Sequence, residues 1–473
     1  MDSESLRERL EAGVDNGIIP TLMDYIRVPS LSPAFDKDWE TNGKMEQAME
    51  ILVNYVKSLN ITGFTHEILK EPGIPWLFFA EFPATAPGLG TVLMYGHMDK
   101  QPHFSGWIEG ADNTSPAIID GKLYGRGGAD DGYALPSAAL IIKTMDDLGI
   151  PRGRIVYIGE NEEESGSDHL MDYVKKLKHK IGEPDIIVCL DSGIGDYEHF
   201  WLTGSLRGFT ALDVTVKVLT VGQHSGDVSG VVPSSFRVFR QILDRIEDPR
   251  SGEILIPELY TPITPEIYEH AAGCARALGP NLLGKINWQP GMQPVTHDPV
   301  QLVLNRTYRP TLCVTGAQGL PDLANAGNLL RPSTTFRLSV RLPPGVDSEV
   351  AAAKLHEVIT KDPPYGATIE VKIPFKGNGF APNPLEPWLS DALNVAGHKY
   401  FGNEFLVMGE GGSIPFMGML GKEFPQAQFM IIGILSSDSN AHSANENFSI
   451  AYLKKLLCCL SEVLAQHGRR TKA

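Results

Sequence analysis

The sequence predicts an α/β protein in which a smaller α+β domain is inserted into a larger domain built around a helix-covered sheet. Short, continuous apolar runs alternate with helical patterns before residue 207 and again after residue 378, which is typical of strands covered on both faces. Between these positions, segments of alternating apolar and polar residues indicate strands with one exposed face. The chain of 473 residues is also long enough for two domains.

The larger domain is expected to contain several helices and four buried strands. Apolar residues at helical spacing predict helices at the N-terminus, around residues 45–59, over 134–149 and over 452–468. The buried strands are predicted from the runs TVLMY (91–95), RIVYI (154–158), DIIVCL (185–190) and FMIIGIL (429–435). Because helical segments separate these runs, we expect a sheet with helices on both faces.

The inserted domain is predicted from two strand–helix units. Every second residue is apolar within 212–218, 336–342 and 369–373, and helical patterns cover 234–248 and 348–360. This order is typical of a small antiparallel sheet with a ferredoxin-like layout. The predicted organisation is therefore one discontinuous domain, 1–206 and 379–473, interrupted by a second domain, 207–378.

The charge balance and the N-terminus limit the expected partners and the compartment. The 57 acidic residues outnumber the 41 lysines and arginines, giving a formal net charge of −16, so nucleic acid and anionic membrane surfaces are not expected partners. The charged start MDSESLRERLEAG contains no apolar signal segment, and no apolar run reaches the roughly 20 residues that span a bilayer. Five cysteines without metal-ligand spacing fit a reducing compartment. We therefore expect a cytoplasmic protein.

Acidic residues and histidine follow the ends of all four buried strands. GHMD (96–99) follows the first strand, GENEEE (159–164) the second, Asp191 the third and His442 the fourth, with Asp130 in an intervening segment. Since ligands bind at the carboxyl ends of parallel strands, these residues are expected to converge. Carboxylates and imidazoles without a thiolate suit Zn²⁺, Mn²⁺ or Co²⁺. Each segment alone also fits ordinary loop or helix-end chemistry, so the residues themselves leave open both a dinuclear metal site and unrelated loops.

Six motifs in a fixed order resemble the M20 family of metallopeptidases. They are YGHMDKQP, GRGGADD, EEESGS, LDSG, EGGSIP and AHSANE, and they extend over nearly the whole chain. The GQHSG segment and the overall length are similar to the branch of cytosolic non-specific dipeptidases and carnosinases. The resemblance implies a zinc-peptidase-like α/β/α catalytic domain, with the inserted domain acting as a lid and dimerisation domain.

The resemblance also implies a role for each polar residue at the strand ends. Two divalent metal ions are expected, Zn²⁺ in the first place and Mn²⁺ or Co²⁺ as alternatives. Glu163 is the implied general base and acid, and Asp99 is implied to orient a ligand histidine. The implied metal ligands are His97, Asp130 and Asp191 for one ion, and Asp130, Glu164 and His442 for the other.

The implied substrate residues lie in other segments. The EGGSIP turn would receive a substrate carboxylate through its amides and the Ser413 hydroxyl, and Arg341 would pair with that carboxylate. His224, in GQHSG, would reach the active site of a partner subunit and stabilise the oxyanion there, which implies a homodimer formed through the lid domain. The complete set of implied substrate-binding residues is Arg341, Asn328, Glu410, Gly412 and Ser413.

The predicted function is hydrolysis of the peptide bond of dipeptides or short peptides by a metal-activated water. Asp191 favours a peptidase, because the family's aminoacylases and succinyl-diaminopimelate desuccinylases tend to have Glu at this position. A deacylase or amidohydrolase acting on N-acyl or N-carbamoyl amino acids is the alternative, and a non-catalytic protein that keeps the fold is a third hypothesis. The family's Asp-Asp-Lys-Gly is Asp130-Asp131-Gly132-Tyr133 here, which leaves the role of that lysine open.

Overall fold

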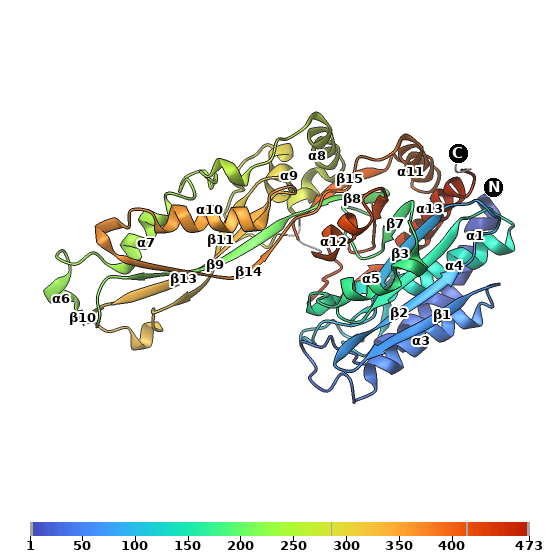
Figure 1. Ribbon diagram of the computed structural model, residues 1–473, viewed down its shortest axis with the longest axis horizontal. Coiled ribbons are helices and arrows are strands. Elements are labelled where there is room, and N and C mark those ends of the chain that lie inside the picture. Colours follow the sequence, from blue (N-terminus) through green and yellow to red (C-terminus); the bar gives the residue numbers. More distant parts are fainter. Residues whose placement is uncertain (1–2, 285, 413–414, 471–473) are drawn as a thin grey trace.

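The computed structural model describes residues 3–284, 286–412 and 415–470 and shows two lobes (Figure 1). The larger lobe contains both ends of the chain, and the smaller lobe extends away from it as an elongated arm. No helix within the described ranges combines the length and the apolar character needed to cross a membrane.

A six-stranded sheet forms the centre of the larger lobe. The strands β6, β3, β7 and β16 are parallel neighbours, whereas β1 and β2 add an antiparallel hairpin beside β6. The four parallel strands overlap the four predicted runs, and the hairpin was not predicted. The order across the sheet is β1 (Thr65–Glu71), β2 (Ile74–Phe82), β6 (Arg154–Glu160), β3 (Thr91–His97), β7 (Ile186–Cys189) and β16 (Gln428–Ile431).

Both faces of this sheet are covered by helices. Alternate residues of β3 face different cores: Val92 and Met94 pack in one, and Leu93 and Tyr95 in the other. This two-residue period explains why the strand is apolar throughout, and it confirms the predicted mixed α/β class. The first core is built with α1 (Ser3–Gly13), α2 (Ile19–Ile26), α3 (Lys44–Ser58), α4 (Ala134–Asp147), α11 (Pro387–Tyr400) and α13 (Ile450–His467), and the second with α5 (Leu170–Ile181) and α12 (Pro415–Glu423).

The smaller lobe is a four-stranded antiparallel sheet with two helices on one face. Along the chain the order is strand, helix, two strands, helix, strand, and the outer strands of the sheet are β11 and β14. This is the connectivity of a ferredoxin-like unit. Its elements are β9 (Gly208–Lys217), α7 (Ser235–Leu243), β11 (Thr311–Gln318), β13 (Ser333–Leu342), α10 (Ser348–Thr360) and β14 (Thr368–Gly377).

Two helices between β9 and β11 pack with the larger lobe. Cys274 of α8 (Pro265–Leu278) and Leu304 of α9 (Pro299–Thr307) belong to the first core of the large sheet. They lie against β15 (Leu406–Glu410), which pairs in parallel with β8 (Trp201–Leu206). The helices therefore connect the arm to the main body, and the division of the chain at residues 207 and 378 stays a prediction.

The segment that enters the arm after β8 and the segment that leaves it after β14 contact each other. The backbone N–H of Leu206 donates to the carbonyl of Phe380 (2.7 Å), and the N–H of Phe380 donates back (2.9 Å). Beside this pair, a Cβ atom on Gly208 would lie 2.6 Å from the backbone nitrogen of Gly379. Glycine at 208 therefore allows the two backbones to approach.

The remaining short strands and one short helix lie in two places. Near the metal-ligand candidates, a three-stranded sheet joins β4 (Ala117–Ile119), β5 (Lys122–Tyr124) and β17 (Asn447–Ser449). At the far end of the arm lie β10 (Gln223–His224), α6 (Ser225–Val228) and β12 (Leu329–Leu330).

Candidate metal centre

The carboxyl ends of the parallel strands bring acidic residues and histidines to one edge of the large sheet. His97 is the last residue of β3, Asp191 follows β7, and the turn after β6 contains Glu163 and Glu164. Asp130 comes from the buried 128–132 segment that precedes α4. Because parallel strands end at the same edge, residues far apart in the sequence become neighbours here.

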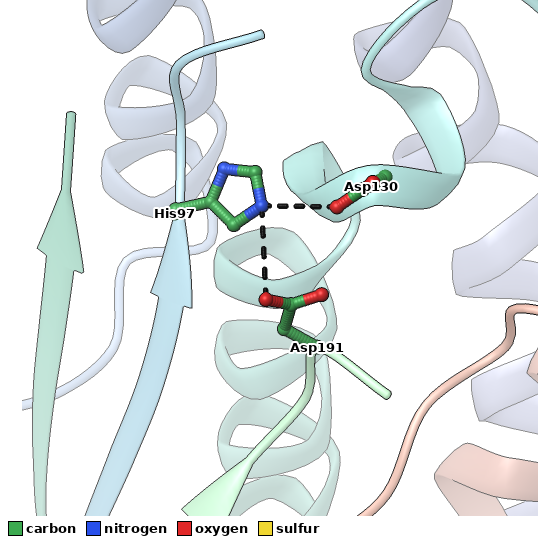
Figure 2. A group of neighbouring side chains, drawn as sticks. All are labelled: His97, Asp130 and Asp191. Carbon is green, nitrogen blue, oxygen red and sulfur yellow. Dashed lines mark hydrogen bonds and ion pairs between the residues drawn. The ribbon is translucent and has the colours of Figure 1, made fainter. Parts of the chain in front are cut away.

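The first group of possible ligands surrounds the His97 ring. Its Nε2 atom lies 3.0 Å from Oδ1 of Asp130 and 3.9 Å from Oδ2 of Asp191 (Figure 2). All three residues are at or near full burial, and one potential ligand atom from each lies within 4.8 Å of the others. These spacings allow one small cation to contact all three side chains.

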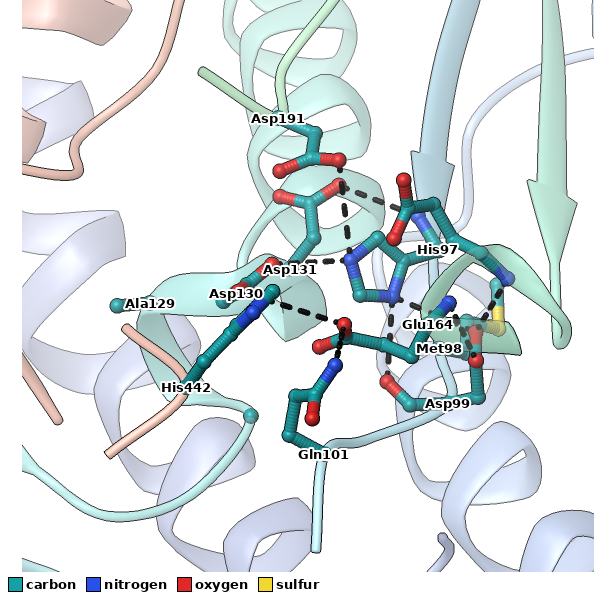
Figure 3. Close-up of polar contacts among 12 residues, drawn as sticks. His97, Met98, Asp99, Gln101, Ala129, Asp130, Asp131, Glu164, Asp191 and His442 are labelled. Carbon is teal, nitrogen blue, oxygen red and sulfur yellow. Dashed lines mark hydrogen bonds and ion pairs between the residues drawn. The ribbon is translucent and has the colours of Figure 1, made fainter. Parts of the chain in front are cut away.

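A second group shares the Asp130 carboxylate. Nε2 of His442 lies 3.0 Å from Oδ2 of Asp130 and 3.1 Å from Oε2 of Glu164 (Figure 3). Gln101 also donates from its side-chain amide to Oε2 of Glu164 at 2.5 Å. Asp130 therefore directs one carboxylate oxygen to each histidine, as a bridging ligand would.

The Asp99 carboxylate connects His97 to the acidic turn. Its two oxygens accept the backbone N–H groups of Glu163 (3.3 Å) and Glu164 (3.1 Å). Nδ1 of His97 lies 3.1 Å from the Asp99 carbonyl oxygen and 3.4 Å from its carboxylate. These acceptors favour a proton on Nδ1, which leaves Nε2 available as a metal ligand.

Crowded negative charge dominates the electrostatics of the cluster. Burial, together with the charge of Asp191, raises the pKa of Glu163 well above its usual range. Burial and the charge of Asp130 raise the pKa of Asp191 to about 7. Hydrogen bonds to Asp130 and Glu164 raise the pKa of His442 to about 11. Protons thus offset the negative charge, and divalent cations held by the same atoms would offset it instead. The oxygen and imidazole donors fit Zn²⁺, Mn²⁺ or Co²⁺.

A cleft of about 620 Å³ adjoins these groups. Asp130, Asp191, His442 and Glu163 line it, together with the residues of the 410–412 turn. Glu163 lines the cleft while its neighbour Glu164 contacts His442. The two adjacent carboxylates therefore serve different partners.

The predicted substrate residues are distributed over several places. Glu410 and Gly412 line the cleft, whereas Ser413 lies outside the described residues. His224 lies at the far end of the arm with a side chain that is 62% exposed (Figure 1). Asn328 is also exposed there, and its backbone carbonyl accepts the N–H of Ser225. Arg341 is half-buried on β13 over the ring of Phe209, and neither it nor the arm-tip residues line the cleft.

Glu446 is a site residue that sequence reasoning missed. One carboxylate oxygen accepts the N–H groups of Gly127 (2.9 Å), Ala129 (3.2 Å) and Asp130 (3.3 Å). The other accepts from Arg126 at 2.5 Å, and this arginine also donates to the carbonyl of Ser443. Glu446 therefore joins the segment that contains Asp130 to the loop that contains His442. It is the last residue of the quoted AHSANE motif, which was the available signal.

The helix-covered sheet and the histidine–carboxylate cluster at its carboxyl edge are those of a metallohydrolase. The chain belongs to peptidase family M20/M25/M40, whose model matches residues 93–466. This match confirms the family predicted from the six motifs and, with it, the prediction of a hydrolytic enzyme.

Individual relatives are similar along most of the chain. Cysteinylglycine-S-conjugate dipeptidase of Corynebacterium striatum is 26% identical over 385 residues, covering 80% of this chain and 81% of the relative. Beta-Ala-His dipeptidase of Homo sapiens is 26% identical over 398 residues, covering 80% and 74%. The solved structure of the di-peptidase Dug1p from Saccharomyces cerevisiae has a TM-score of 0.73 at 21% identity, covering 100% of this chain and 99% of that one.

Proposed function

We propose that this protein hydrolyses the peptide bond of dipeptides or very short peptides with two bound divalent cations, Zn²⁺ in the first place and Mn²⁺ or Co²⁺ as alternatives. The observation that carries the proposal is the sharing of Asp130 between two three-residue groups that border one cleft with Glu163. Family membership supports it, as do the names of the similar proteins, which are dipeptidases.

The two groups would each hold one cation. When bound, the cations would lower the pKa of a water molecule and polarise the carbonyl group of the substrate. The holding residues would be His97, Asp130 and Asp191 for one ion, and Asp130, Glu164 and His442 for the other.

Glu163 would move the proton. It lines the cleft, and burial raises its pKa well above the usual range, so its carboxylate form is a stronger base than that of an exposed glutamate. In the proposed reaction it takes a proton from the attacking water and gives it to the leaving amine. Asp99 keeps Glu163 in place by accepting its backbone N–H, and it keeps the His97 ring in one tautomer.

The remaining assignments concern the substrate carboxylate and a second subunit. The 410–412 turn, with Ser413 and Arg341, would hold the substrate carboxylate. The arm would act as a lid and dimerisation domain, and His224 and Asn328 would serve the partner's cleft. Exposed apolar residues near β10, α6 and β12 support burial of the arm tip against a second copy, because Val221, Val231 and Leu323 are 63%, 81% and 94% exposed.

A metal-reconstitution assay tests this function. The protein is stripped with a chelator, each of Zn²⁺, Mn²⁺ and Co²⁺ is added back, and rates are measured on Ala-Ala, N-acetylalanine and N-carbamoylalanine. We expect hydrolysis of Ala-Ala that is lost on chelation and restored by a metal. Faster turnover of either acylated amino acid would instead support the deacylase or amidohydrolase alternative.

A pair of glutamate variants tests the role of Glu163. Glu163→Gln should lower kcat by at least about 100-fold, because general acid–base catalysis contributes about 10²- to 10⁴-fold. Glu162→Gln is the matched control, since Glu162 pairs with His169 at 2.9 Å and does not line the cleft. Equal rates in the two variants would remove Glu163 from the mechanism.

A further inference from the structure

Arg306 presents a positive charge to the cleft beside the candidate metal centre. It lies in the last turn of α9, its side chain is exposed, and it lines the cleft together with Glu163 and Asp191. Its Nη2 atom donates weakly to Sδ of Met408 (3.5 Å). Within the described ranges it forms no ion pair. A cation at a helix C-terminus is favoured by the helix dipole, but that role would be independent of any substrate.

A second arginine orients the turn that faces Arg306. Arg207 is buried behind the turn; its backbone N–H donates to the carbonyls of Glu410 (3.3 Å) and Gly412 (3.1 Å), and its Nε donates to that of Gly411 (3.3 Å). In a trans peptide the C=O of one residue and the N–H of the next point in opposite directions. Because the carbonyl of Gly411 accepts from Arg207, the N–H of Gly412 points away from Arg207. Among the residues that the structure describes, a Cβ atom on Gly412 would meet nothing within 4 Å, so these residues do not cover the turn at this position.

Positive charge is concentrated around this turn. Burial, followed by the charges of Arg341 and Arg306, lowers the pKa of Arg207 to about 10. Three guanidinium groups thus lie close enough to repel one another, and Glu410 is the acidic residue of the 410–412 turn. Arg306 is the one of the three that lines the cleft, so a carboxylate of a substrate bound there would offset its charge.

We propose that Arg306 forms an anion subsite for the side-chain carboxylate of an acidic residue on the leaving side of the scissile bond, beside the turn that is proposed to hold the main-chain carboxylate of the same residue. The substrate class is then dipeptides that end in Glu or Asp. The proposal rests on the proposed dipeptidase function and adds a substrate preference to it. A planar guanidinium suits this task because it can donate two parallel hydrogen bonds to a carboxylate.

The test compares two substrates that differ only in charge. The kcat/KM values for Ala-Glu and Ala-Gln are measured, and their ratio is compared among variants, because this ratio is independent of the fraction of folded enzyme. The wild type should prefer Ala-Glu, and Arg306→Gln should lower the ratio by about 10- to 100-fold, the range for a lost charge-assisted contact. Arg306→Lys should keep part of the preference, and Arg306→Glu should shift it toward Ala-Lys.

Arg309→Gln is the matched control. Arg309 lies three residues further along, donates to the side chain of Gln301 (3.2 Å) and does not line the cleft, so its substitution should leave the ratio unchanged. An unchanged ratio in Arg306→Gln, or a wild-type preference for Ala-Gln, would overturn the subsite. If the wild type cleaves no dipeptide with any metal, the proposed function fails. The same ratio on N-acetylglutamate and N-acetylglutamine then tests the subsite by itself.

Discussion

Removal of the Glu446 carboxylate should weaken both the fold and the metal centre. The Glu446→Ala substitution leaves the N–H groups of Gly127, Ala129 and Asp130 without their acceptor, and it leaves the Arg126 guanidinium without its counter-ion. The side chains of this ion pair are 2% and 0% exposed. Breaking a buried ion pair from one side costs about 3–5 kcal/mol, so we expect a loss of that size in the free energy of unfolding.

A surface arginine–glutamate pair with a similar distance between its charged groups provides the control. Arg7 and Glu11 are 2.6 Å apart, close to the 2.5 Å of the buried pair, but their side chains are 65% and 37% exposed. Glu11→Ala should therefore change the free energy of unfolding by at most about 1 kcal/mol. Chemical denaturation of the metal-free proteins measures both values.

Metal binding provides the second measurement on the same variants. Because Glu446 positions the segments that contain Asp130 and His442, Glu446→Ala should lower metal affinity by about 10- to 100-fold, the usual effect of losing a residue that orients a ligand. Glu446→Gln keeps an acceptor oxygen for the amides and should fall between the wild type and Glu446→Ala. Equal stability losses in Glu446→Ala and Glu11→Ala, or unchanged metal affinity, would refute the reasoning.

Two further predictions concern the connection between the lobes and the loop before His442. Gly208→Ala places a Cβ atom 2.6 Å from the Gly379 nitrogen and should lower the free energy of unfolding by about 1–3 kcal/mol in thermal or chemical denaturation. Gly327→Ala is the control and should be neutral, because a Cβ atom there meets nothing within 4 Å among the described residues. Similar effects at both positions would contradict this. Burial would raise the pKa of Asp438, but hydrogen bonds from Lys122, Ser436 and Tyr197 lower it to about 2. A lowered folded-state pKa stabilises the protein above the unfolded value near 3.8. Asp438→Asn should thus lose about 1 kcal/mol above pH 4, allowing for solvent screening of a side chain that is 55% exposed, and the difference should vanish toward pH 2; a constant difference between pH 2 and pH 6 would exclude it.

The helices and strands that were predicted correctly are those with a pattern in their own sequence. The four parallel strands are continuous apolar runs, and the helix predicted over 348–360 coincides with α10 (Ser348–Thr360). The β1–β2 hairpin was missed because no residue of β1 is fully buried and the strand depends on pairing with β2. The attachment of α8 and α9 to the larger lobe was also missed. An amphipathic helix indicates that one face is buried, but it does not indicate against which partner.

The residues of the candidate site also differ in how well the sequence indicates them. The ligand candidates could be named because carboxylates and histidines after buried strands share one edge of a sheet, and because the motifs resemble one family. Glu446 and Arg207 act mainly on backbone N–H and carbonyl groups of segments far away in the sequence. Such contacts depend on backbone geometry, so the AHSANE motif could point to Glu446 but not to its partners, and only the structure shows what these two side chains contact. Arg306 has a helix-end position that is ordinary in sequence, and only the cleft distinguishes it.

The sharing of Asp130 between two metal ions is the central claim, and metal stoichiometry tests it most directly. Elemental analysis of protein dialysed against buffered Zn²⁺ should find about two ions per chain in the wild type, because six ligand atoms form two groups. His442→Ala should retain about one ion, since only the group with Glu164 loses a ligand. Asp130→Ala should lose both. One ion in the wild type, or one tightly held ion in Asp130→Ala, would contradict the shared site.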